Sequence, residues 1–258
     1  GNLMTPTEIE SIFAKYHKPN WGSVSVDETL FIRDLIDRHK PKSFVEFGMA
    51  SGLSCALIAK AMDDAGIDGV IHTIVHDDTF LGDNTKPNGF LIDEVYSGSR
   101  VKVHKHKFKR SIDLDDLDLG PFEMAFIDAA HPHPWPLIDT LFVRPHMTGS
   151  KTVIHHDLEL FTKQRVVLGI GPKYVWDQFP ESARQRGEGG ASNIFSVSLD
   201  IDDATFERIF CDGILLPWTS QLGPMVVHRV RKVVERTLSK RALDVFNEAM
   251  IRFNAPKK

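Results

Sequence analysis

The sequence predicts an α/β protein with a Rossmann-like, doubly wound, mostly parallel seven-stranded sheet and helices on both faces. Three observations lead to this fold class. β-prone runs alternate with helix-forming segments from residue 43 to residue 155, which is typical of a parallel sheet covered on both sides. A glycine-bearing turn joins the first strand to the next helix. The length of 258 residues, of which 42% are hydrophobic, suffices for one large core.

The N-terminal part is expected to hold two helices before the first strand. Apolar residues at helical spacing mark residues 7–16 and 27–39, and Asp27 is placed to cap the second helix. Residues 43–47 form the first strand, which stops at the turn Gly48-Met49-Ala50-Ser51-Gly52. A helix pattern returns over residues 53–62.

The alternation continues to residue 155 and then loosens. The expected strands are residues 70–75, 101–107, 124–127 and 152–155, with helices at 88–96 and 137–143. Beyond them we expect a helix within residues 169–179, late strands at 193–199 and 209–216, and one long basic amphipathic helix at 226–252. Residues 181–191, with arginines among glycines, have the composition of a mobile loop, either a lid over substrate or an ordinary connection.

Charge and cysteine content exclude several classes of protein. The formal charge is 31 − 35 = −4, which gives no overall basic field for nucleic acid or an anionic membrane. Cys55 and Cys211 are too few for a disulfide scaffold or a zinc module. The longest uncharged stretch, residues 214–228, is too short to span a bilayer, and no signal-peptide pattern opens the chain. We therefore expect a cytoplasmic protein that binds neither nucleic acid nor membrane.

The first candidate site is the turn after the first strand. Its small residues let a ligand approach the backbone closely, and the N–H groups at the start of the following helix face the same crevice. Glu46, just before the turn, can accept hydrogen bonds from an ammonium group or a ribose hydroxyl. A plain packing turn is the alternative, and Ala50 breaks the Gly-x-Gly-x-x-Gly dinucleotide pattern.

Two further strands end in acids and histidines. Residues 126–131 read Phe-Ile-Asp-Ala-Ala-His, and residues 153–157 read Val-Ile-His-His-Asp. The carboxyl ends of parallel strands face the ligand crevice, so Asp128, His131, His156 and Asp157 are expected at one rim. Oxygen and nitrogen donors of this kind can hold a hard or borderline divalent ion. Strand alternation sends His155 and His156 to opposite faces, so at most one of them is a ligand.

A further motif, Asp78-Thr79-Phe80-Leu81-Gly82-Asp83, lies after the second strand. With it, the sequence resembles class I S-adenosylmethionine-dependent methyltransferases, in particular the small-molecule and sugar O-methyltransferases that include catechol and caffeoyl-CoA methyltransferases. Residues 45–54 look like that group's first motif, acid-x-Gly-x-x-Ser/Thr-Gly-x-Ser. Residues 78–83 are similar to the second motif of bacterial methyltransferases found with glycan and natural-product genes. The resemblance covers roughly residues 43–161.

This resemblance implies an enzyme that moves a methyl group to a hydroxyl of a sugar or another small polyhydroxylated molecule. It implies a general-base role for His131, with Asp128 beside it in the catalytic pair. The residues implied for S-adenosylmethionine are Glu46, Gly48, Ser51, Gly52, Asp78 and Asp128, with Asp77 as a competitor of Asp78. Those implied for a divalent cation such as Mg²⁺ are Asp128, His156 and Asp157. The corresponding division of the chain is a helical cap (1–42), a methyltransferase domain (43–225) and a basic C-terminal helix (226–258).

Two departures and two alternatives accompany this interpretation. His156-Asp157 stands where the family has Asp-Asp or Asp-Asn, and Lys151 stands where it has glycine, so metal binding is left open. The alternatives are an NAD(P)-dependent oxidoreductase, which Ala50 disfavours, and a non-catalytic cofactor-binding interaction protein docking through the basic helix. That helix is also compatible with a homo-oligomer contact or a solvated face. Three tryptophans are expected either in the acceptor pocket or in the core: Trp135, Trp176 and Trp218.

Overall fold

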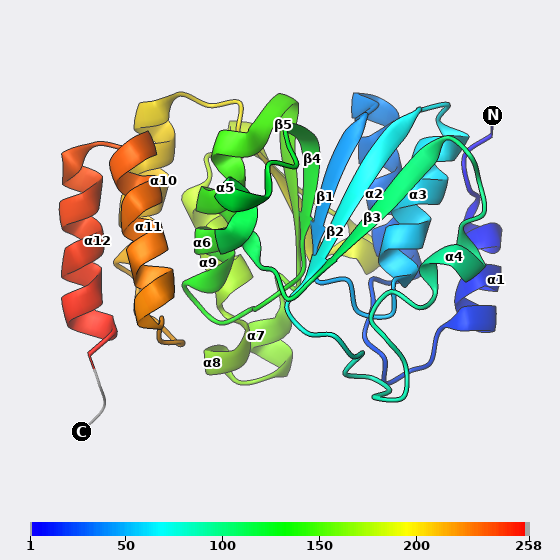
Figure 1. The fold of residues 1–258 in the computed structure, drawn as a ribbon, viewed down its shortest axis with the longest axis horizontal. Coiled ribbons are helices and arrows are strands. Elements are labelled where there is room, and N and C mark those ends of the chain that lie inside the picture. Colours follow the sequence, from blue (N-terminus) through cyan, green and yellow to red (C-terminus); the bar gives the residue numbers. More distant parts are fainter. Residues whose placement is uncertain (1, 256–258) are drawn as a thin grey trace.

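The chain folds into one seven-stranded sheet between two layers of helices, as the computed structural model shows for residues 2–255 (Figure 1). The α/β class is therefore confirmed. The strand order is β3-β2-β1-β4-β5-β7-β6. The strands are β1 (Ser43–Phe47), β2 (Gly69–Val75), β3 (Val101–Lys107), β4 (Phe122–Ile127), β5 (Met147–His156), β6 (Arg184–Arg186) and β7 (Ile194–Ser198).

The sheet is parallel from β3 to β5 and ends in an antiparallel pair. β1 pairs with β2 and β4, β2 with β3, and β4 with β5, all in parallel. β7 runs antiparallel to both β5 and β6. From β1 the chain adds β2 and β3 on one side of the sheet, and from β4 it adds β5 and then the β7–β6 pair on the other side. A crevice outside the carboxyl ends of these two central strands is the usual ligand site of such a sheet.

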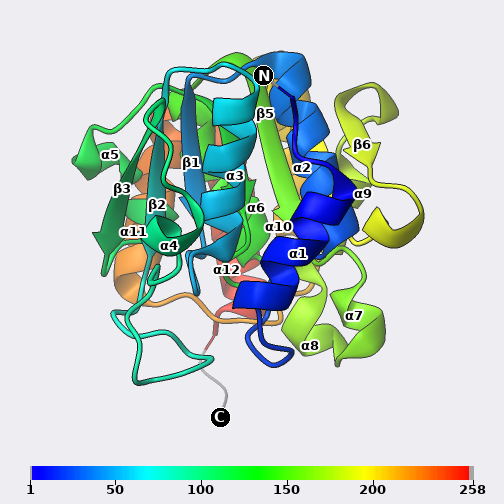
Figure 2. The same ribbon diagram turned by 90° about the vertical axis from the view of Figure 1, so that its right-hand side faces the viewer.

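The helices divide between the two faces of the sheet. Figure 2 looks onto the face covered by α1, α2 and α3, while α6 and α10 to α12 lie behind the strands. The helices are α1 (Pro6–Tyr16), α2 (Val26–His39), α3 (Leu53–Asp64), α4 (Ile92–Val95), α5 (Leu114–Leu117), α6 (Trp135–Val143), α7 (Leu160–Lys163), α8 (Val166–Gly169), α9 (Gly171–Gln178), α10 (Asp203–Ile214), α11 (Pro224–Thr237) and α12 (Lys240–Phe253). Two separate apolar clusters, one on each face, hold the layers together.

The C-terminal region differs from the single helix expected at residues 226–252. Leu238 and Ser239 are extended, and they divide the region into α11 and α12. Each helix buries one apolar stripe, with Val230 and Val234 on α11 and Phe246 on α12. α12 packs on α10 and α11 and forms an outer third layer (Figure 1).

The strand expected at residues 209–216 is wrong, because this segment belongs to α10. Phe206, Ile209 and Phe210 are buried at helical spacing, and the Asp202 side chain caps the helix by accepting from the Thr205 N–H at 2.7 Å. A short apolar run looks the same in a buried strand and in the buried stripe of a helix.

Three smaller expectations also need correction. Ser25, not Asp27, caps α2, in a reciprocal capping box with Glu28. Of the helix expected at residues 88–96, only the single turn α4 forms. The segment 181–191 is not a plain loop, since Arg184–Arg186 adds β6 to the sheet edge.

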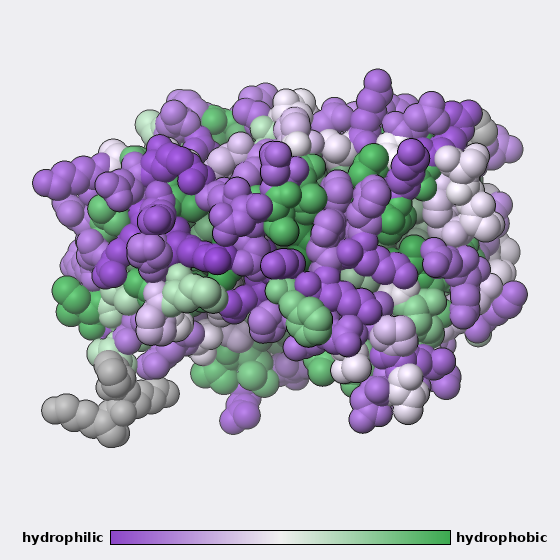
Figure 3. Space-filling view, viewed as in Figure 1, coloured by the Kyte–Doolittle hydropathy of each residue, from purple (hydrophilic) through white to green (hydrophobic). Residues whose placement is uncertain are grey.

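The surface in Figure 3 is mostly hydrophilic, with apolar side chains scattered between charged ones. Among the described helices, none has both the length and the apolar character that crossing a membrane requires.

Candidate active site

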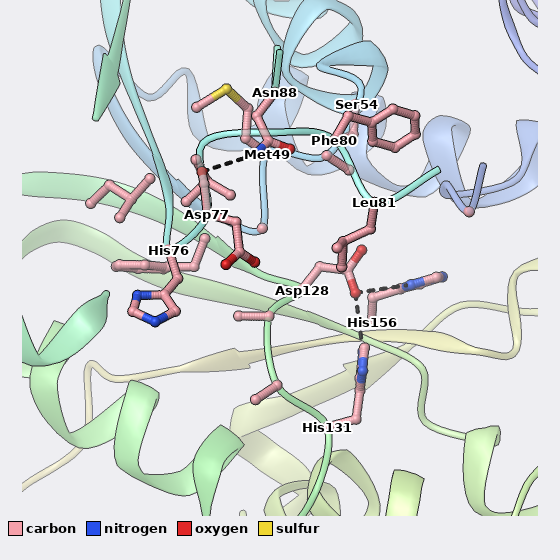
Figure 4. A pocket seen from close by; sticks show the side chains of 18 of the residues that line it. Met49, Ser54, His76, Asp77, Phe80, Leu81, Asn88, Asp128, His131 and His156 are labelled. Atoms are coloured by element: carbon pink, nitrogen blue, oxygen red, sulfur yellow. Dashed lines mark hydrogen bonds and ion pairs between the residues drawn. The ribbon is translucent and has the colours of Figure 1, made fainter. Parts of the chain in front are cut away.

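A cleft of about 910 Å³ opens at the carboxyl ends of β1, β2, β4 and β5 (Figure 4). This position is the crevice at which the strand order reverses. Its lining includes the turn after β1, Asp77 after β2, and Asp128 and Asp157 after β4 and β5. Residues expected from four separate motifs therefore meet in one cavity.

The glycine turn, residues 48–52, contains two glycines whose positive φ angles and close neighbours leave no room for a side chain. Gly48 has φ +100°, and a Cβ on it would lie 1.9 Å from the carbonyl oxygen of Asp128. Gly52 has φ +94°, and a Cβ there would lie 2.6 Å from the Ile92 side chain. Gly48 and Ser51 line the cleft, whereas Gly52 packs behind it against the segment before α4. The turn brings the backbone of the β1 loop against that of the β4 loop.

Glu46 lies behind this turn and does not line the cleft. Its carboxylate is fully buried in β1 and accepts hydrogen bonds from Thr73 Oγ1 at 2.6 Å and from Ser54 Oγ at 3.0 Å. Burial raises the pKa of Glu46 to about 7, although the two hydrogen bonds oppose the shift. Ser54, its partner on α3, does reach the cleft, so Glu46 supports the wall from within.

Asp77, rather than Asp78, enters the cleft after β2. Figure 4 shows the Asp77 carboxylate directed into the cavity, and its backbone carbonyl accepts from Asn88 Nδ2 at 2.9 Å. Asp78 is not part of the lining, and its carboxylate lies 3.2 Å from Lys107 Nζ. Of the two acids considered for this position, the structure therefore places Asp77 in the cleft and Asp78 outside it.

Next to the glycine turn lies the acid–histidine cluster, formed by Asp128, His131, His156 and Asp157. His131 Nε2 lies 3.1 Å from Asp128 Oδ1 and 2.8 Å from Asp157 Oδ2. His156 Nδ1 lies 3.5 and 3.4 Å from the same two oxygens. These last contacts are ion pairs without hydrogen-bond geometry, so His156 Nδ1 is a buried nitrogen without a hydrogen-bond partner. Figure 4 shows both imidazoles converging on the Asp128 carboxylate.

The four groups of the cluster hold one another in their charged forms. Burial alone would raise the pKa of Asp128, but His156 and His131 lower it to about 2. Burial would lower the pKa of His131, yet hydrogen bonds to Asp128 and Asp157 raise it to about 9. The same two histidines hold the pKa of Asp157 below its usual range, although burial opposes this shift. The surrounding carboxylates raise the pKa of His156 well above the usual value for histidine, again against the effect of burial. His131 therefore carries a proton near neutral pH in this arrangement.

Glu28 is a functional contact that the sequence reasoning missed. It comes from α2, far from β5 in the chain, and its Oε2 lies 2.7 Å from His156 Nε2. Its Oε1 accepts from the Ser25 N–H at 2.7 Å, which completes the capping box. The Ser-x-x-Glu pattern could have revealed the cap, but no local signal reveals the contact with His156. This contact fixes the ring so that Nδ1 faces the acids.

The N-terminal segment supplies another unexpected wall. Asn20 to Ser23 line the cleft, and Trp21 packs edge-to-face on Phe80 and Phe90 with ring centroids 5.4 Å apart. These aromatic rings anchor the loop after β2, whose Leu81 side chain points over Asp128 in Figure 4. The segment before α2 thus closes one side of the cavity.

Several residues singled out from the sequence lie away from the cleft. His155 is buried on the opposite face, where it stacks on Phe195 and shares a hydrogen bond with Thr140. Trp135 lines the cavity, whereas Trp176 and Trp218 lie outside it and pack, partly buried, against the apolar core. No residue of 181–191 lines the cavity within the described part of the chain, so the structure gives no support to the lid.

Comparison with known proteins adds family information. The model of a family described as a methyltransferase domain matches residues 45–158. No curated protein matches the chain in sequence. Three solved structures share the fold, each with a TM-score of 0.51 and 16% identity. One, from Staphylococcus aureus, is assigned as a caffeoyl-CoA O-methyltransferase and is matched over 76% of this chain and 91% of its own.

The second is the O-methyltransferase TomG from Streptomyces achromogenes, involved in tomaymycin synthesis and solved in complex with SAM. It is matched over 75% of this chain and 87% of its own. The third, from Klebsiella pneumoniae, is assigned as an O-methyltransferase and is matched over 74% and 88%. At 16% sequence identity, these similarities show a common fold and nothing more specific.

Proposed function

We propose that this chain is a class I S-adenosylmethionine-dependent methyltransferase and that it methylates a hydroxyl oxygen of a sugar or another small polyhydroxylated molecule. The match of residues 45–158 to a methyltransferase domain and the fold shared with solved O-methyltransferases support this proposal. The observation that carries the proposal is the acid–histidine cluster, which shares one cleft with the glycine turn. A cofactor held by the turn has its reactive end within the same cavity as groups that bind and deprotonate a hydroxyl.

The proposed chemistry is a direct displacement. The acceptor oxygen attacks the methyl carbon of the sulfonium, the carbon–sulfur bond breaks, and S-adenosylhomocysteine leaves. The protein aligns donor and acceptor and takes up the hydroxyl proton. His131 at the rim of the cleft is the proposed base, with Asp128 and Asp157 orienting its ring. Gly48 and Ser51 are the proposed cofactor contacts, joined by Asp77 in the position first given to Asp78.

The residues of the cluster also fit a divalent cation. Four donor atoms from Asp128, His131, His156 and Asp157 are separated by 2.8 to 3.5 Å across their acid–imidazole pairs. Ligands about 2 Å from a tetrahedral ion are spaced by roughly 3.3 Å. The unpartnered His156 Nδ1 is the kind of nitrogen that such an ion satisfies, and Glu28 on its other nitrogen is a typical outer partner.

We assign Asp128, His156 and Asp157 as the proposed ligands and keep His131 as the base. His131 also lies close enough to Asp128 and Asp157 to be a ligand itself. An imidazole beside two carboxylates favours Mn²⁺, Fe²⁺ or Zn²⁺ over Mg²⁺. When bound, such an ion lowers the pKa of a coordinated hydroxyl. His131 accepts a proton only as the neutral ring, which forms most readily when its two carboxylate partners are otherwise engaged.

The three-part division of the chain also stays a proposal. Residues 1–42 act as a cap, which is supported by the position of Asn20 to Ser23 in the cleft wall and by the contact of Glu28 with His156. Residues 43–225 form the methyltransferase domain, and residues 226–258 form the C-terminal part, now with two helices.

Ligand-dependent thermal stability tests the cofactor assignment. A compound that binds only the native state raises the unfolding temperature by mass action. We expect stabilisation by S-adenosylmethionine and S-adenosylhomocysteine and none by NAD or NADP. Transfer of a labelled methyl group to a panel of sugars, polyols and catechols then identifies the acceptor class. Stabilisation by the nicotinamides alone would overturn the assignment.

Chelation and metal analysis test the cation separately. We expect turnover to fall after chelation and to return with Mn²⁺ more fully than with Mg²⁺. The His156→Ala variant should lose bound metal, whereas His131→Ala should retain it and lose turnover. Loss of metal in both variants would make His131 a ligand, and unchanged activity after chelation would remove the ion from the reaction.

A further inference from the structure

Three histidines gather on one face of β2 and β3, away from the cleft. His72 is the register partner of His104, and His106 lies two residues further along β3. Residues two apart on a strand project to the same side, so the three rings share one face at the edge of the sheet. His72 lies four residues before His76 of the cleft lining, roughly 13 Å along the strand.

The rings of this histidine cluster, His72, His104 and His106, contact one another directly. His72 Nδ1 lies 2.9 Å from His106 Nε2. The His104 ring stacks on His72, with centroids 5.1 Å apart and planes inclined by 20°. Phe122 of β4 supports His72 from behind, at 6.0 Å between centroids. His104 is exposed to solvent, whereas His72 and His106 are half-buried.

Two of the three histidines, His72 and His106, favour the neutral form. Burial, together with the neighbouring His106 and His104, lowers the pKa of His72 to about 4. Burial and His104 also lower the pKa of His106. Among residues 2–255, no carboxylate forms an ion pair with these rings. Near neutral pH His72 and His106 therefore offer uncharged imidazole nitrogens, which is the form that binds metal.

We propose that His72, His104 and His106 form a second metal site, which takes a late first-row divalent cation such as Zn²⁺, Ni²⁺ or Cu²⁺. Imidazole nitrogens are preferred ligands of these ions. His72 Nδ1 and His106 Nε2 are already at the spacing of two ligands on one ion. The exposed His104 ring supplies the third nitrogen after rotating out of its stack, and water completes the coordination.

If the three histidines only protect the edge of the sheet from pairing with another chain, they are not expected to bind metal. β3 is an edge strand, and its lysines at 102, 105 and 107 oppose pairing with another chain. The histidines could serve the same purpose through their mutual hydrogen bond alone. In that case the edge binds no metal at micromolar concentration.

Calorimetric titration of the full chain with Zn²⁺ tests the proposal. Measurements on wild type and on Asp157→Asn separate this site from the acid–histidine cluster. We expect one Zn²⁺ site that survives Asp157→Asn and weakens in His106→Gln and in His104→Gln. The loss should reach at least the roughly 10–100-fold that removing an outer partner causes.

The exposed His228, on α11, provides the matched control, because His228→Gln removes an imidazole outside the cluster. It should leave Zn²⁺ affinity unchanged, and in the Asp157→Asn background Zn²⁺ should raise the unfolding temperature of this variant but not of His104→Gln. The substituted His104 ring is exposed, so this variant is expected to fold. Equal Zn²⁺ affinity in wild type, His104→Gln and His106→Gln would overturn the proposal, as would affinity no tighter than millimolar.

Discussion

The two walls of the cleft are built in different ways. The glycine turn contributes backbone and small side chains, and the one buried acid behind it, Glu46, never reaches the cavity. The acid–histidine cluster contributes four ionisable side chains whose charges depend on one another. The glycine turn is therefore sensitive to added side-chain volume, whereas the acid–histidine cluster is sensitive to the loss of single polar atoms. Substitutions of each kind can break or sharpen this contrast.

The largest effect is expected from Gly48→Ala. The new Cβ would lie 1.9 Å from the Asp128 carbonyl oxygen, so the β1 and β4 loops must separate. We expect a loss of stability of about 4 kcal/mol or more and no measurable binding of S-adenosylhomocysteine. Chemical denaturation and calorimetry measure the two effects.

Gly189→Ala is the matched control for that substitution. Gly189 also has a positive φ, at +56°, but nothing lies within 4 Å of its missing Cβ. It should show only the cost of the backbone conformation, about 1–3 kcal/mol, with normal cofactor binding. Equal losses in the two variants would mean that the close approach of the loops is unimportant.

The next effect concerns the acid–histidine cluster. His131→Ala should lower the rate of methyl transfer by about 10²–10⁴-fold while the affinity for S-adenosylhomocysteine stays within twofold of wild type. The reason is that His131 contacts the acids of the cluster and not the glycine turn. Single-turnover kinetics with saturating cofactor measure the rate, and full turnover by the variant would contradict the base assignment.

Glu46→Gln tests the buried support of the glycine turn. The folded-state pKa of Glu46, about 7, exceeds its ordinary value of 4.5, so the native protein keeps a proton that the unfolded chain releases. Stability from this group is therefore complete below pH 4.5 and is lost as pH rises to about 7, by roughly 3 kcal/mol in all. The variant should lack this decline.

Urea denaturation between pH 4.5 and pH 8 measures the decline in wild type and in the variant. Glu10→Gln, at an exposed position of α1, is the control and should follow the wild-type curve. A parallel decline in Glu46→Gln would assign the pH dependence to other groups.

The smallest effects separate two adjacent acids. Asp77→Asn should weaken S-adenosylhomocysteine binding about tenfold, because a carboxylate in the cleft makes stronger hydrogen bonds than an amide. Asp78→Asn should change it less than twofold, since this carboxylate only pairs with Lys107 at the surface. Calorimetric titration of both variants with S-adenosylhomocysteine measures the two affinities. A larger loss of affinity in Asp78→Asn than in Asp77→Asn would assign the cofactor contact to Asp78.

The sequence predicted best those elements whose pattern is local. β1 and β3 occupy the predicted residues 43–47 and 101–107, because uninterrupted β-prone runs end there at a glycine turn or a polar loop. Asp128, His131, His156 and Asp157 lie together because strand ends in a parallel sheet share one edge, a rule that needs only the strand assignments.

What the sequence could not predict depends on distant contacts. Glu28 meets His156 only because α2 packs beside β5 across the folded domain. The choice between Asp77 and Asp78 depends on how far the chain continues past β2 before it turns. The apolar run of α10 reads equally well as a strand, and its Asp202 cap was the local clue to a helix.

The absence of a side chain at Gly48 has a mechanical consequence. The Asp128 N–H donates to the Phe47 carbonyl at 2.9 Å, and the Gly48 N–H donates to the Ile74 carbonyl at 3.0 Å. These two hydrogen bonds join the first residues of the loops after β1 and β4 to the ends of β1 and β2 beneath the cavity. The floor on which a methyl donor and its acceptor would lie is thus tied together by backbone hydrogen bonds, whereas Trp21, Leu81 and Leu160 line the cavity from segments outside this floor.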